Sequence, residues 1–488
     1  MKPLLVVDSP KRWPLEIPGT EVVSAYRYLS DPAYSQGPGR KVFNLCRSIR
    51  YQAAGYYVSL LAEARGHRPL PSMAAIQDLK LAPVIKLVSQ DLDELMQSSL
   101  RRIKSESFDL SVYFGRNVSA GHDRLALAVF NAFPAPLLRA KFEHNGRWRL
   151  AGVKVIGLGD MPETHKAFVV EQAERYLKRS PRRGKAEAPS RYDLAILRNE
   201  ADPMPPSSGE TLKKFANAGE ELGICCELIG KDAYGRLAEF DGLFIRETTY
   251  VNHYTFRFSR RAAAEGLVVI DDPRSIMRCM NKVYLAETLG RHRVPTPKTL
   301  ILSKDNAAEG IRSLGFPCVV KQPDSSFSAG VSRIDSADGL DDFLAERFEQ
   351  SDLLIAQEYV PTIFDWRIGV LDGKPLYACR YGMAAGHWQI VKREGTDIEY
   401  GNYETLAVED APQDVVRLGV RAAKLMGDGL YGVDLKVIGA RPIVIEVNDN
   451  PNIDAGVEDA VLGDELYRRV MRYFLERFEA RGVEEKIR

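Results

Sequence analysis

The chain has 488 residues, and its 67 Lys and Arg against 66 Asp and Glu give a formal net charge of +1. With 45% hydrophobic and 27% charged residues it is neither a polycation nor a disordered or collagen-like chain. The length predicts about three or four domains. No run approaches the ~20 apolar residues of a membrane span, and the N-terminal run is too short for a secretory signal. We expect a soluble cytoplasmic protein that binds neither nucleic acid nor membrane.

The first third of the chain, residues 1–177, is expected to form an α+β domain. Short apolar runs at 4–7 and 153–158 predict strands. Between residues 45 and 65, apolar side chains recur three and four residues apart, which predicts one amphipathic helix.

Positive charges occur at two places in and after this domain. Arg47 and Arg50, together with Tyr51, could bind an anionic substrate, although a helix packed on its own domain explains the same pattern. Residues 178–190 are rich in Arg, Lys, Pro and Ser without apolar periodicity or interleaved aromatic residues. That composition favours a solvated linker over a nucleic-acid patch.

Residues 191–290 alternate between strand and helix patterns, which predicts a parallel sheet covered by helices. Strands are expected at 192–197, 224–229, 242–245 and 267–270, with helices at 210–222 and 253–264. Asp272 and Pro273 then supply an N-cap and a first-turn proline for a helix that is expected to run without interruption to Gly290.

A β-hairpin is predicted between residues 432 and 452, where two β-branched runs flank a three-residue turn. If Val437 pairs with Ile443, the same register places Asp434 directly opposite Glu446, with their β-carbons ~5 Å apart. Two carboxylates in such a pair repel each other unless a positive charge lies between them.

A divalent cation would resolve this repulsion. Asn448 lies on the same face as Glu446 by period-two alternation, so the hairpin offers two carboxylates and an amide oxygen. These hard oxygen ligands suit Mg²⁺, which takes its remaining ligands from water and nucleotide phosphates. The alternative is that Asp434 pairs with Lys436 or with a distant arginine and holds no metal.

The nucleotide half of a site is predicted upstream. The apolar strand 316–321 ends in Lys321, and a loop of small residues at 322–331 could fold over phosphates or be an ordinary surface turn. A second apolar strand at 353–360 ends in Gln357-Glu358-Tyr359, and Asp365-Trp366-Arg367 follows.

In this order the motifs resemble the ATP-grasp superfamily, and most of all the RimK-type carboxylate–amine ligases. The resemblance spans about residues 191–475 and rests on seven motifs: Asn281-Lys282, Val319-Val320-Lys321, the small-residue loop 322–331, Gln357-Glu358-Tyr359-Val360, Asp365-x-Arg367, Gly432-Val433-Asp434-Leu435 and Glu446-Val447-Asn448-x-x-Pro451. The first ~180 residues resemble the domain often found ahead of RimK-like ATP-grasp modules, through 44–48 and 55–61. The implied fold is α/β (α+β): an ATP-grasp domain at 291–488, a Rossmann-like pre-ATP-grasp domain at 191–290, and an additional N-terminal domain.

The resemblance also implies ATP and Mg²⁺, with Mn²⁺ as an alternative metal, and it assigns roles to matching residues. Those implied for the nucleotide are Lys282, Lys321, Ser328 and Gly330 at the phosphates, Gln357, Glu358 and Tyr359 at the adenine, Asp365 at the ribose, and Gln389 and Lys392 as weaker nucleotide or substrate contacts. Those implied for the metal are Asp434, Glu446 and Asn448. The phosphate loop departs from the family, because Ser325 and Ser328 stand where glycines are usual.

The resemblance implies a ligase that makes an acyl phosphate from a carboxylate and ATP and then lets an amine displace the phosphate. Such a reaction needs positive charge at the transferring phosphoryl group and at the developing oxyanion. Arg380 is expected to face the acyl phosphate and Arg367 to lie nearer the nucleotide, unless either is a structural partner of Glu358 or Asp365. An amino acid such as glutamate is the expected amine. A ligase acting on a protein or peptide terminus, a non-catalytic ATP-binding regulator, and a homo-oligomer all remain open.

Overall fold

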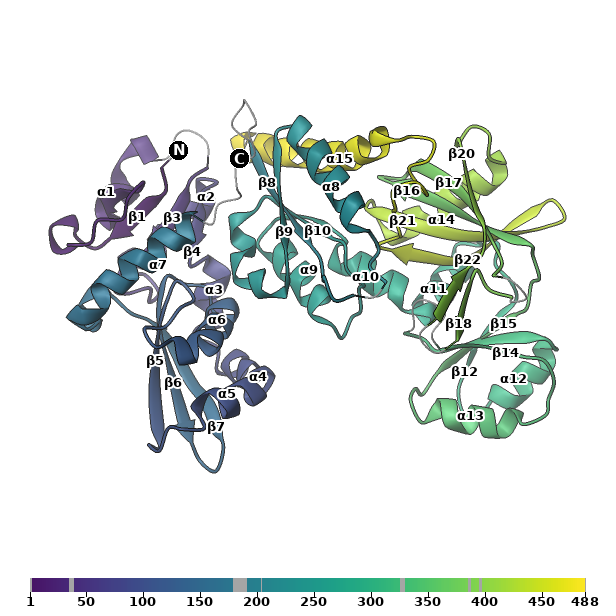
Figure 1. The fold of residues 1–488 in the computed structure, drawn as a ribbon, viewed down its shortest axis with the longest axis horizontal. Coiled ribbons are helices and arrows are strands. Elements are labelled where there is room, and N and C mark those ends of the chain that lie inside the picture. The colour runs from purple at the N-terminus through teal and green to yellow at the C-terminus, as the bar shows by residue number, and fades with distance from the viewer. Residues whose placement is uncertain are drawn as a thin grey trace.

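The computed structural model describes residues 2–34, 39–178, 191–202, 204–324, 330–384, 388–394 and 397–487. Three units follow one another along the long axis: an N-terminal unit, a middle unit and the unit that carries the hairpin (Figure 1). The predicted linker lies outside the described residues except for Lys178, which ends helix α7.

The N-terminal unit begins with a parallel four-stranded sheet of order β2-β1-β3-β4. Its elements are β1 (Leu4–Val7), β2 (Glu21–Ser24), α1 (Ala25–Ser30), β3 (Lys41–Asn44), α2 (Ala54–Ala64), β4 (Arg68–Leu70) and α3 (Met73–Asp78). The predicted start of α2 at residue 45 is wrong. Leu45 directly follows β3 in extended connection with the sheet, because its backbone N–H donates to the Val6 carbonyl at 2.8 Å, and the helix begins only at Ala54.

A second, antiparallel sheet of order β5-β6-β7 completes this unit. It is formed by β5 (Ser107–Tyr113), β6 (Leu137–His144) and β7 (Trp148–Val155), with helices α4 (Ala82–Asp91), α5 (Asp93–Leu100), α6 (Asp123–Ala132) and α7 (Lys166–Lys178). Leu5, Val7, Phe43 and Leu45 of the first sheet share one apolar core with this second layer. The predicted α+β character is therefore confirmed.

The middle unit has a parallel sheet of order β11-β10-β8-β9. Its elements are β8 (Tyr192–Leu197), α8 (Gly209–Glu221), β9 (Ile224–Ile229), the 3-10 helix η6 (Lys231–Glu239), β10 (Gly242–Ile245), α9 (Tyr254–Ala264), β11 (Val268–Ile270) and α10 (Pro273–Met280). The predicted strands and helices are confirmed to within about one residue. Ser208 and Asp272 cap α8 and α10, as their side chains accept from the first-turn backbone N–H groups.

The uninterrupted helix predicted from Pro273 to Gly290 is wrong. It is two helices, because Asn281 leaves the helical conformation and caps α11 (Lys282–Arg291) by accepting from the Tyr284 N–H. The break turns Lys282, the first residue of α11, into the cavity described below.

The N-terminal and middle units repeat the same arrangement. All strands in both sheets are parallel. If the four strands of each unit are numbered in chain order, both sheets have the spatial order second, first, third, fourth. Three pairs of elements, α2 and α9, β4 and β11, and α4 and α11, begin and end exactly 200 residues apart, at the bounds given above. Ser59 donates to the Pro71 carbonyl at 2.8 Å, and Ser259 donates to the Asp271 carbonyl at 2.6 Å. The two units are therefore structural copies of each other over 4–92 and 192–292, apart from α8, which has no α-helical counterpart between β1 and β2.

The third unit contains two antiparallel sheets of order β12-β15-β13-β14 and β20-β17-β16-β21-β22. The smaller sheet has β12 (Thr299–Leu302), α12 (Ala307–Leu314), β13 (Cys318–Lys321), β14 (Val331–Ile334), α13 (Leu340–Phe348) and β15 (Leu354–Glu358). The larger has β16 (Phe364–Leu371), β17 (Lys374–Gly382), β20 (Tyr403–Leu406), α14 (Gln413–Met426), β21 (Leu430–Ile438) and β22 (Arg441–Asp449), beside the hairpin β18 (Val391–Glu394) and β19 (Asp397–Tyr400).

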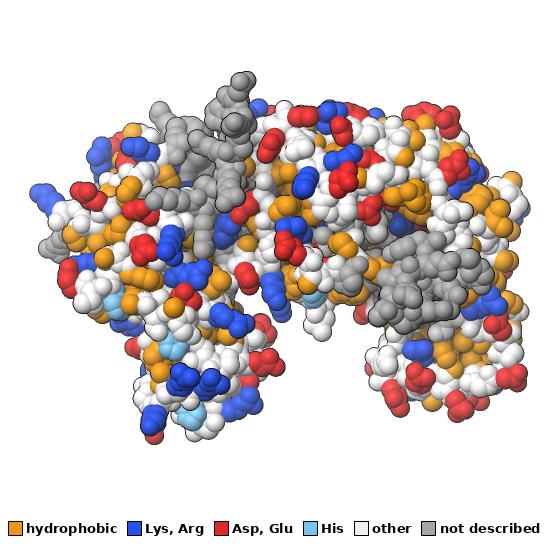
Figure 2. Space-filling model, viewed as in Figure 1, with side chains coloured by type: hydrophobic (Ala, Val, Ile, Leu, Met, Phe, Trp, Pro, Cys, Tyr) orange, Lys and Arg blue, Asp and Glu red, His pale blue; other side chains and the backbone are white. Residues whose placement is uncertain are grey.

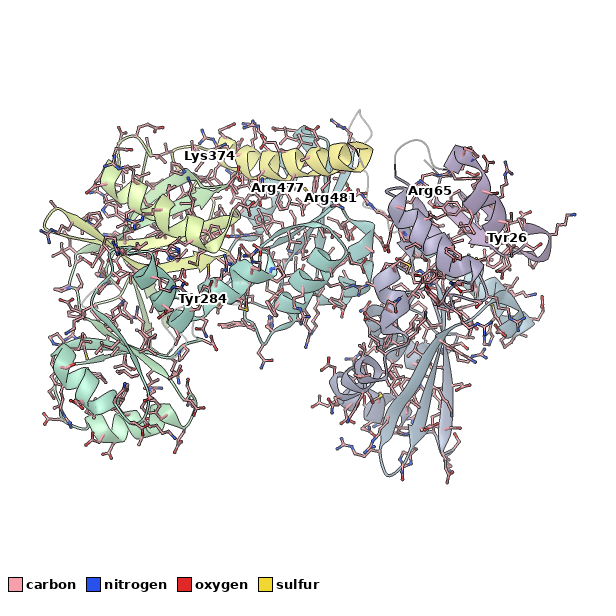
Figure 3. The ribbon with its side chains drawn as sticks, turned by 180° about the vertical axis from the view of Figure 1, so that it is seen from behind. Tyr26, Arg65, Tyr284, Lys374, Arg477 and Arg481 are labelled. Atoms are coloured by element: carbon pink, nitrogen blue, oxygen red, sulfur yellow. The ribbon has the colours of Figure 1, made fainter. Side chains whose placement is uncertain are left out.

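The last helix, α15 (Asp464–Ile487), returns to the middle unit and lies along it (Figures 1 and 3). Its residues Tyr467 and Phe474 contact Phe215 and Phe244 of the middle unit, with ring centroids 4.8 and 5.6 Å apart. The predicted boundary at 290 and 291 therefore differs from the packing in two ways. Helix α15 completes the middle core, whereas α11 packs into the core of the larger sheet.

The predicted turn of the β21–β22 hairpin is wrong, although the predicted facing pair is right. Ile438 pairs with Arg441, so the turn has two residues, and Val437 faces Pro442. A β-bulge then shifts the register by one residue at Ile445, and Asp434 and Glu446 come to lie directly opposite each other.

Candidate functional site

A cavity of about 990 Å³ lies where the middle unit meets both sheets of the third unit. It is lined by the middle-unit residues Met204 to Pro206, Ser208, Thr248 and Thr249, by the hairpin strands β21 and β22, by the ends of β13 and β15, and by residues 450–452, 454, 457 and 458. Every predicted metal residue lies in its wall.

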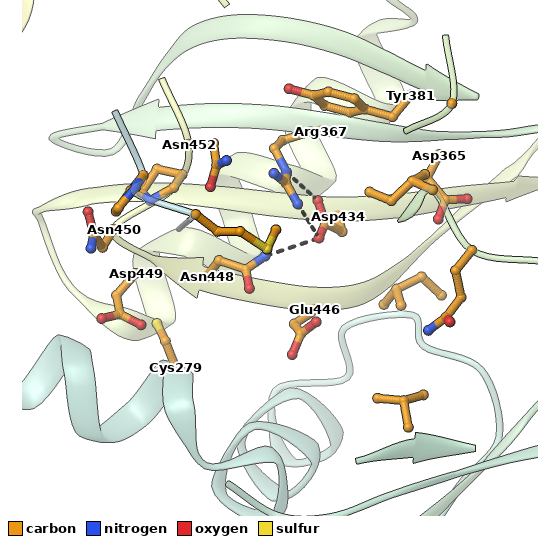
Figure 4. Close-up of a pocket in the computed structure, with 18 of the residues that line it drawn as sticks. Cys279, Asp365, Arg367, Tyr381, Asp434, Glu446, Asn448, Asp449, Asn450 and Asn452 are labelled. Carbon is orange, nitrogen blue, oxygen red and sulfur yellow. Dashed lines mark hydrogen bonds and ion pairs between the residues drawn. The ribbon is translucent and has the colours of Figure 1, made fainter. Parts of the chain in front are cut away.

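Asp434 and Asn448 form one hydrogen-bonded group with Arg367 at the centre of the cavity (Figure 4). The Arg367 Nε and Nη2 donate to the two Asp434 carboxylate oxygens at 2.7 and 2.9 Å. The Asn448 Nδ2 donates to Asp434 Oδ2 at 3.0 Å. Burial opposes the charge of Arg367, but the Asp434 carboxylate outweighs it and holds the pKa of Arg367 well above its usual range. The alternative of an arginine partner for Asp434 is thus confirmed in this structure.

The facing carboxylate, Glu446, pairs with one predicted phosphate lysine, Lys282, and is influenced electrostatically by the other, Lys321. Lys282 Nζ lies 2.9 Å from Glu446 Oε1. Burial alone would raise the pKa of Glu446, but Lys282 and Lys321 together lower it. Burial lowers the pKa of Lys321, and the Glu446 carboxylate opposes that shift. The site therefore gathers two acids and three cations in a shielded space, where charges interact more strongly than in water.

The chemistry of the predicted metal ligands suits Mg²⁺, with one condition. Within the described ranges, no three His, Cys, Asp or Glu side chains are grouped as a metal site. The hairpin instead offers two acids and the Asn448 carbonyl oxygen, since the Asn448 amide nitrogen is engaged by Asp434 and Gly432. These are hard oxygen donors of the kind magnesium prefers. Arg367 and Lys282 occupy the carboxylates here, so a cation would have to replace them.

The predicted adenine hinge lies at the end of β15. The Glu358 backbone N–H donates to the Lys298 carbonyl at 2.9 Å, and the buried Gln357 side chain donates to Thr299 Oγ1 at 3.1 Å. The hinge is therefore held in place by the Gln357 side-chain amide and by the backbone hydrogen bond of Glu358. The Tyr359 ring stands edge-on to Trp388, with centroids 6.0 Å apart, at the cavity wall.

Asp365, the predicted ribose acceptor, lines the same cavity and lies 2.8 Å from Lys436 Nζ. Thr362 Oγ1 also donates to it at 2.9 Å. Burial raises the pKa of Asp365, and Lys436 opposes the shift. The carboxylate is thus positioned before any ligand arrives.

The other predicted nucleotide residues are only partly brought together. Gln389 lines the cavity, and Gly330 adopts a φ of 73° directly before β14. Ser328 lies outside the described residues, as does the side chain of Lys392. The predicted departure of the phosphate loop at Ser325 and Ser328 therefore lies outside the described residues.

Arg380 does not face the cavity, contrary to expectation. It is directly opposite Trp366 in the β16–β17 ladder, whereas Arg367 is one residue further along, so the two arginines point to opposite faces of the sheet. Arg380 lies over the rings of Phe364 and Trp366 and pairs with Glu404. It therefore has a structural role, but with Glu404 as its partner in place of the expected Glu358 or Asp365.

The sequence analysis missed the wall opposite the nucleotide side. It is formed by Ser208, Thr248 and Thr249 of the middle unit and by Asn450 and Asn452 after β22. A signal was present, because Thr248 and Thr249 follow a strand of a parallel sheet, and ligands bind at the carboxyl ends of such strands.

Charges of both signs are interspersed over the described part of the face shown in Figure 2, without a broad patch of one sign. Within the described residues, no helix combines the length and the apolar character needed to cross a bilayer.

Two family models match the chain. The RimK-like ATP-grasp N-terminal domain matches residues 25–172, and the RimK-like ATP-grasp domain matches residues 279–466. Alpha-aminoadipate–LysW ligase LysX of Saccharolobus solfataricus is 37% identical over 100 residues, which are 20% of this chain and 36% of that protein. Probable alpha-L-glutamate ligase 1 of Shewanella denitrificans is 27% identical over 232 residues, 47% of this chain and 76% of that protein. The chain thus spans about a third of the first relative and three quarters of the second.

Among solved structures, D-alanine–D-alanine ligase from Bacillus anthracis complexed with ATP aligns with a TM-score of 0.45 and 17% sequence identity. The alignment covers 59% of this chain and 99% of that one.

Proposed function

The chain belongs to the RimK-like ATP-grasp family, and on that premise we propose that it is an ATP-dependent ligase that joins a carboxylate to an amine. The observation that carries the proposal is the facing pair of Asp434 and Glu446, with Lys282, Lys321 and Arg367 directed at it within one cavity. Facing carboxylates can bind a divalent metal, and the lysine and arginine side chains paired with them can bind a polyanion that arrives with that metal.

ATP is proposed to bind between the two sheets. Its adenine would meet the backbone of residues 357–359, its ribose would face Asp365, and its phosphates would lie against Lys321 and Lys282. Lysine is a compact charge suited to phosphate. Because Lys282 pairs with Glu446 in the structure, phosphate binding requires that lysine to exchange one anionic partner for another.

Mg²⁺, or Mn²⁺ in its place, is proposed to bind Asp434, Glu446 and Asn448. A bound divalent ion supplies Lewis-acid charge at the phosphates. Arg367, released from Asp434, would then turn its guanidinium toward the developing negative charge of the acyl transfer. Arg380 takes no part, because it lies on the other face of the sheet.

The carboxylate and amine are proposed to enter beside Ser208, Thr249 and Asn452, on the wall away from the nucleotide. The names of the relatives mention glutamate, alpha-aminoadipate and the LysW protein. An amino acid is therefore our first candidate for a substrate, and a protein or peptide terminus is the second.

The test is amine-dependent release of ADP. Purified protein is incubated with ATP, Mg²⁺ and pooled amino acids or peptides, and products are identified by mass spectrometry. We expect ADP release that requires the amine and is abolished in Glu446→Gln, but kept in Glu409→Gln, a control at an exposed acid. ATP binding without turnover in any pool would contradict the ligase and favour an ATP-binding regulator.

A further inference from the structure

Among the described residues, Arg246 heads the fully buried side chains in size, with 0% of its surface exposed. It follows β10 directly and lies behind the cavity wall, between the middle unit and the segment after β22. Its Nη1 donates to Asn450 Oδ1 at 2.8 Å, and its Nη2 donates to the Pro451 carbonyl at 2.8 Å. On the other side, Nη2 donates to the Pro206 carbonyl at 2.7 Å and Nε to Ser207 Oγ at 3.0 Å.

These bonds tie together two segments that line the cavity from different units. Residues 206–208 lead into α8, and residues 450–452 continue from the predicted metal ligand Asn448. The Asn450 side chain extends the connection, because its Nδ2 donates to the Glu247 carbonyl at 2.6 Å. Asn450 also holds a φ of 45°, in the left-handed region that non-glycine residues rarely adopt. Arg246 therefore fixes an unfavourable backbone turn next to the proposed metal site.

A buried guanidinium is costly in this place. The five hydrogen bonds that the structure gives Arg246 all go to neutral oxygens. Burial lowers the pKa of Arg246 to about 10, and Asp271 opposes that shift. An apolar side chain of similar volume is often at least as stable as a buried ion. Stability alone thus gives little reason for an arginine here.

The chain contains its own comparison for this position. Leu45 occupies the same place in the N-terminal copy, since Leu45 donates its backbone N–H to Val6 and Arg246 donates its own to Leu197, both at 2.8 Å. Leu45 is 5% exposed and packs in the apolar core beneath the second sheet. At this position after the third strand, the N-terminal copy has a leucine packed in an apolar core. The middle unit has an arginine bonded to the segments that line the cavity.

We propose that Arg246 is a positioning residue of the ligase site, which holds residues 448–452 in the geometry that places Asn448 against Asp434 and Glu446. The inference rests on the proposed function. It adds that the N-terminal copy, with Leu45 at this position, contributes no equivalent site.

The first test compares Arg246→Lys and Arg246→Gln with a matched control, Arg278→Gln. Arg278 also connects the middle and third units, donating to the carbonyls of Leu425 and Met426 at 3.3 and 2.9 Å, but it does not line the cavity. For Arg246→Gln we expect kcat to fall by roughly ten- to a hundredfold, as for residues that orient ligands from behind. At saturating Mg²⁺, KM for ATP should change by less than about threefold, since Arg246 contacts none of the residues proposed to hold the adenine, ribose or phosphates. Arg246→Lys should recover part of kcat.

A merely structural role for Arg246 would be shown if Arg278→Gln lost as much kcat for the same drop in melting temperature, and that result would overturn the proposal. A second readout does not depend on turnover. We would titrate Mn²⁺ by electron paramagnetic resonance in the presence of adenylyl imidodiphosphate. Arg246→Gln should bind Mn²⁺ at least about tenfold more weakly than wild type or Arg278→Gln, in line with lost outer-sphere support. Unchanged Mn²⁺ affinity would overturn the proposal, whereas a wild type without amine-dependent ADP release would overturn the ligase function alone.

Discussion

At the scale of single residues, each acid of the site has a cation beside it. Asp434 is held by Arg367, and Glu446 by Lys282. The side chains of Asp434 and Arg367 are 16% and 15% exposed, so neither charge is well solvated. The groups proposed to bind phosphate and metal therefore neutralise one another in the structure, which keeps a dense cluster of charges stable without a ligand.

Removing one partner of the Arg367–Asp434 pair should therefore be costly. We expect Asp434→Asn to lower the free energy of unfolding by about 3–5 kcal/mol, because the Arg367 guanidinium is left buried without its carboxylate. Glu404→Gln is the control, because it breaks the pair with Arg380 on the opposite, more exposed face and should cost less than about 1 kcal/mol. Urea denaturation measures both. Equal losses would contradict the burial argument.

Asp449 should make the stability of the fold fall as pH rises, whereas a carboxyl group whose pKa is lowered by folding makes stability rise with pH. Burial raises its pKa to about 7, although Thr249 donates to it at 2.7 Å. Between its unfolded value of about 3.9 and 7, the folded state binds more protons than the unfolded state, so stability falls as pH rises.

We expect the wild type to lose stability relative to Asp449→Asn as pH rises from about 4 to 7, by roughly 1.4 kcal/mol for each unit of pKa difference. Above pH 7 the difference should stay constant, because both states are then ionised. Melting temperatures of the two proteins across that range provide the measurement. A difference independent of pH would show that Asp449 titrates normally.

At the scale of elements, the β-bulge at Ile445 decides where the acids point. The turn is one residue shorter than its sequence suggests, and without the bulge the hairpin would pair Asp434 with Ile445. Alternating polarity predicts a strand but not a bulge, because the extra residue is visible only in the ladder. The facing pair was predicted correctly because two errors cancel. The real turn is one residue shorter than predicted, and the bulge adds one residue to β22.

The hairpin also depends on a close approach of its neighbour. A β-carbon at Gly432 would lie 2.8 Å from the Pro451 β-carbon, too near for two carbon atoms. Gly432→Ala should displace residues 450–452, reduce kcat, and cost roughly 1–3 kcal/mol of stability.

Gly429→Ala is the control for that substitution, because its β-carbon would meet only the Tyr431 side chain, with the hydroxyl nearest at 3.4 Å. Steady-state kinetics and denaturation of the two variants distinguish them. Full activity in Gly432→Ala would mean that the segment after β22 tolerates displacement, and would also weaken the role assigned to Arg246.

Several elements could be predicted from the sequence and others could not. The strands of the middle unit were found because each is a short apolar run between polar turns. The break at Asn281 was missed, since a polar residue within an apolar periodicity reads equally well as helix surface. The facing of Arg380 was missed because a shift of one residue along a strand reverses its side.

The internal repeat was missed for a different reason. Few residues are identical at a spacing of 200 within the shared elements, and they are small or apolar: Ser59, Ala62, Ala64, Gly66 and Ile76, which recur as Ser259, Ala262, Ala264, Gly266 and Ile276. Such residues are common in any helix and strand packed in a core. The shared topology, not the shared sequence, reveals the copies.

At the scale of the whole molecule, the two copies are joined through charged contacts. Arg68, which begins β4, donates to the Glu239 carbonyl and the Asp241 carboxylate of the middle unit and lies 3.9 Å from Asp193. Ser72 Oγ donates to Glu265 at 3.1 Å. The N-terminal unit thus attaches at the end of the middle sheet far from the third unit (Figure 1).

We expect Arg68→Ala to loosen this attachment by about 1–3 kcal/mol, as for hydrogen bonds to charged groups. Calorimetry should then show the N-terminal unit unfolding earlier than the rest. The ligase kcat should stay within about twofold, since none of the described residues of the N-terminal unit lines the cavity. Arg27→Ala, at an exposed helix pair with Asp31, is the control and should change stability by less than about 0.5 kcal/mol. Loss of kcat in Arg68→Ala would show coupling between the N-terminal unit and the site.

Helix α15 also orders events on the ribosome. The middle sheet buries Phe215 and Phe244 under Tyr467 and Phe474, which are translated only after the entire third unit. At roughly 5–20 residues per second, the nascent middle sheet waits many seconds with one face uncovered. The N-terminal unit closes its core within its own residues, with the second sheet β5-β6-β7 covering the first. During translation the N-terminal unit can therefore fold first, and it is already folded while the middle sheet still lacks α15.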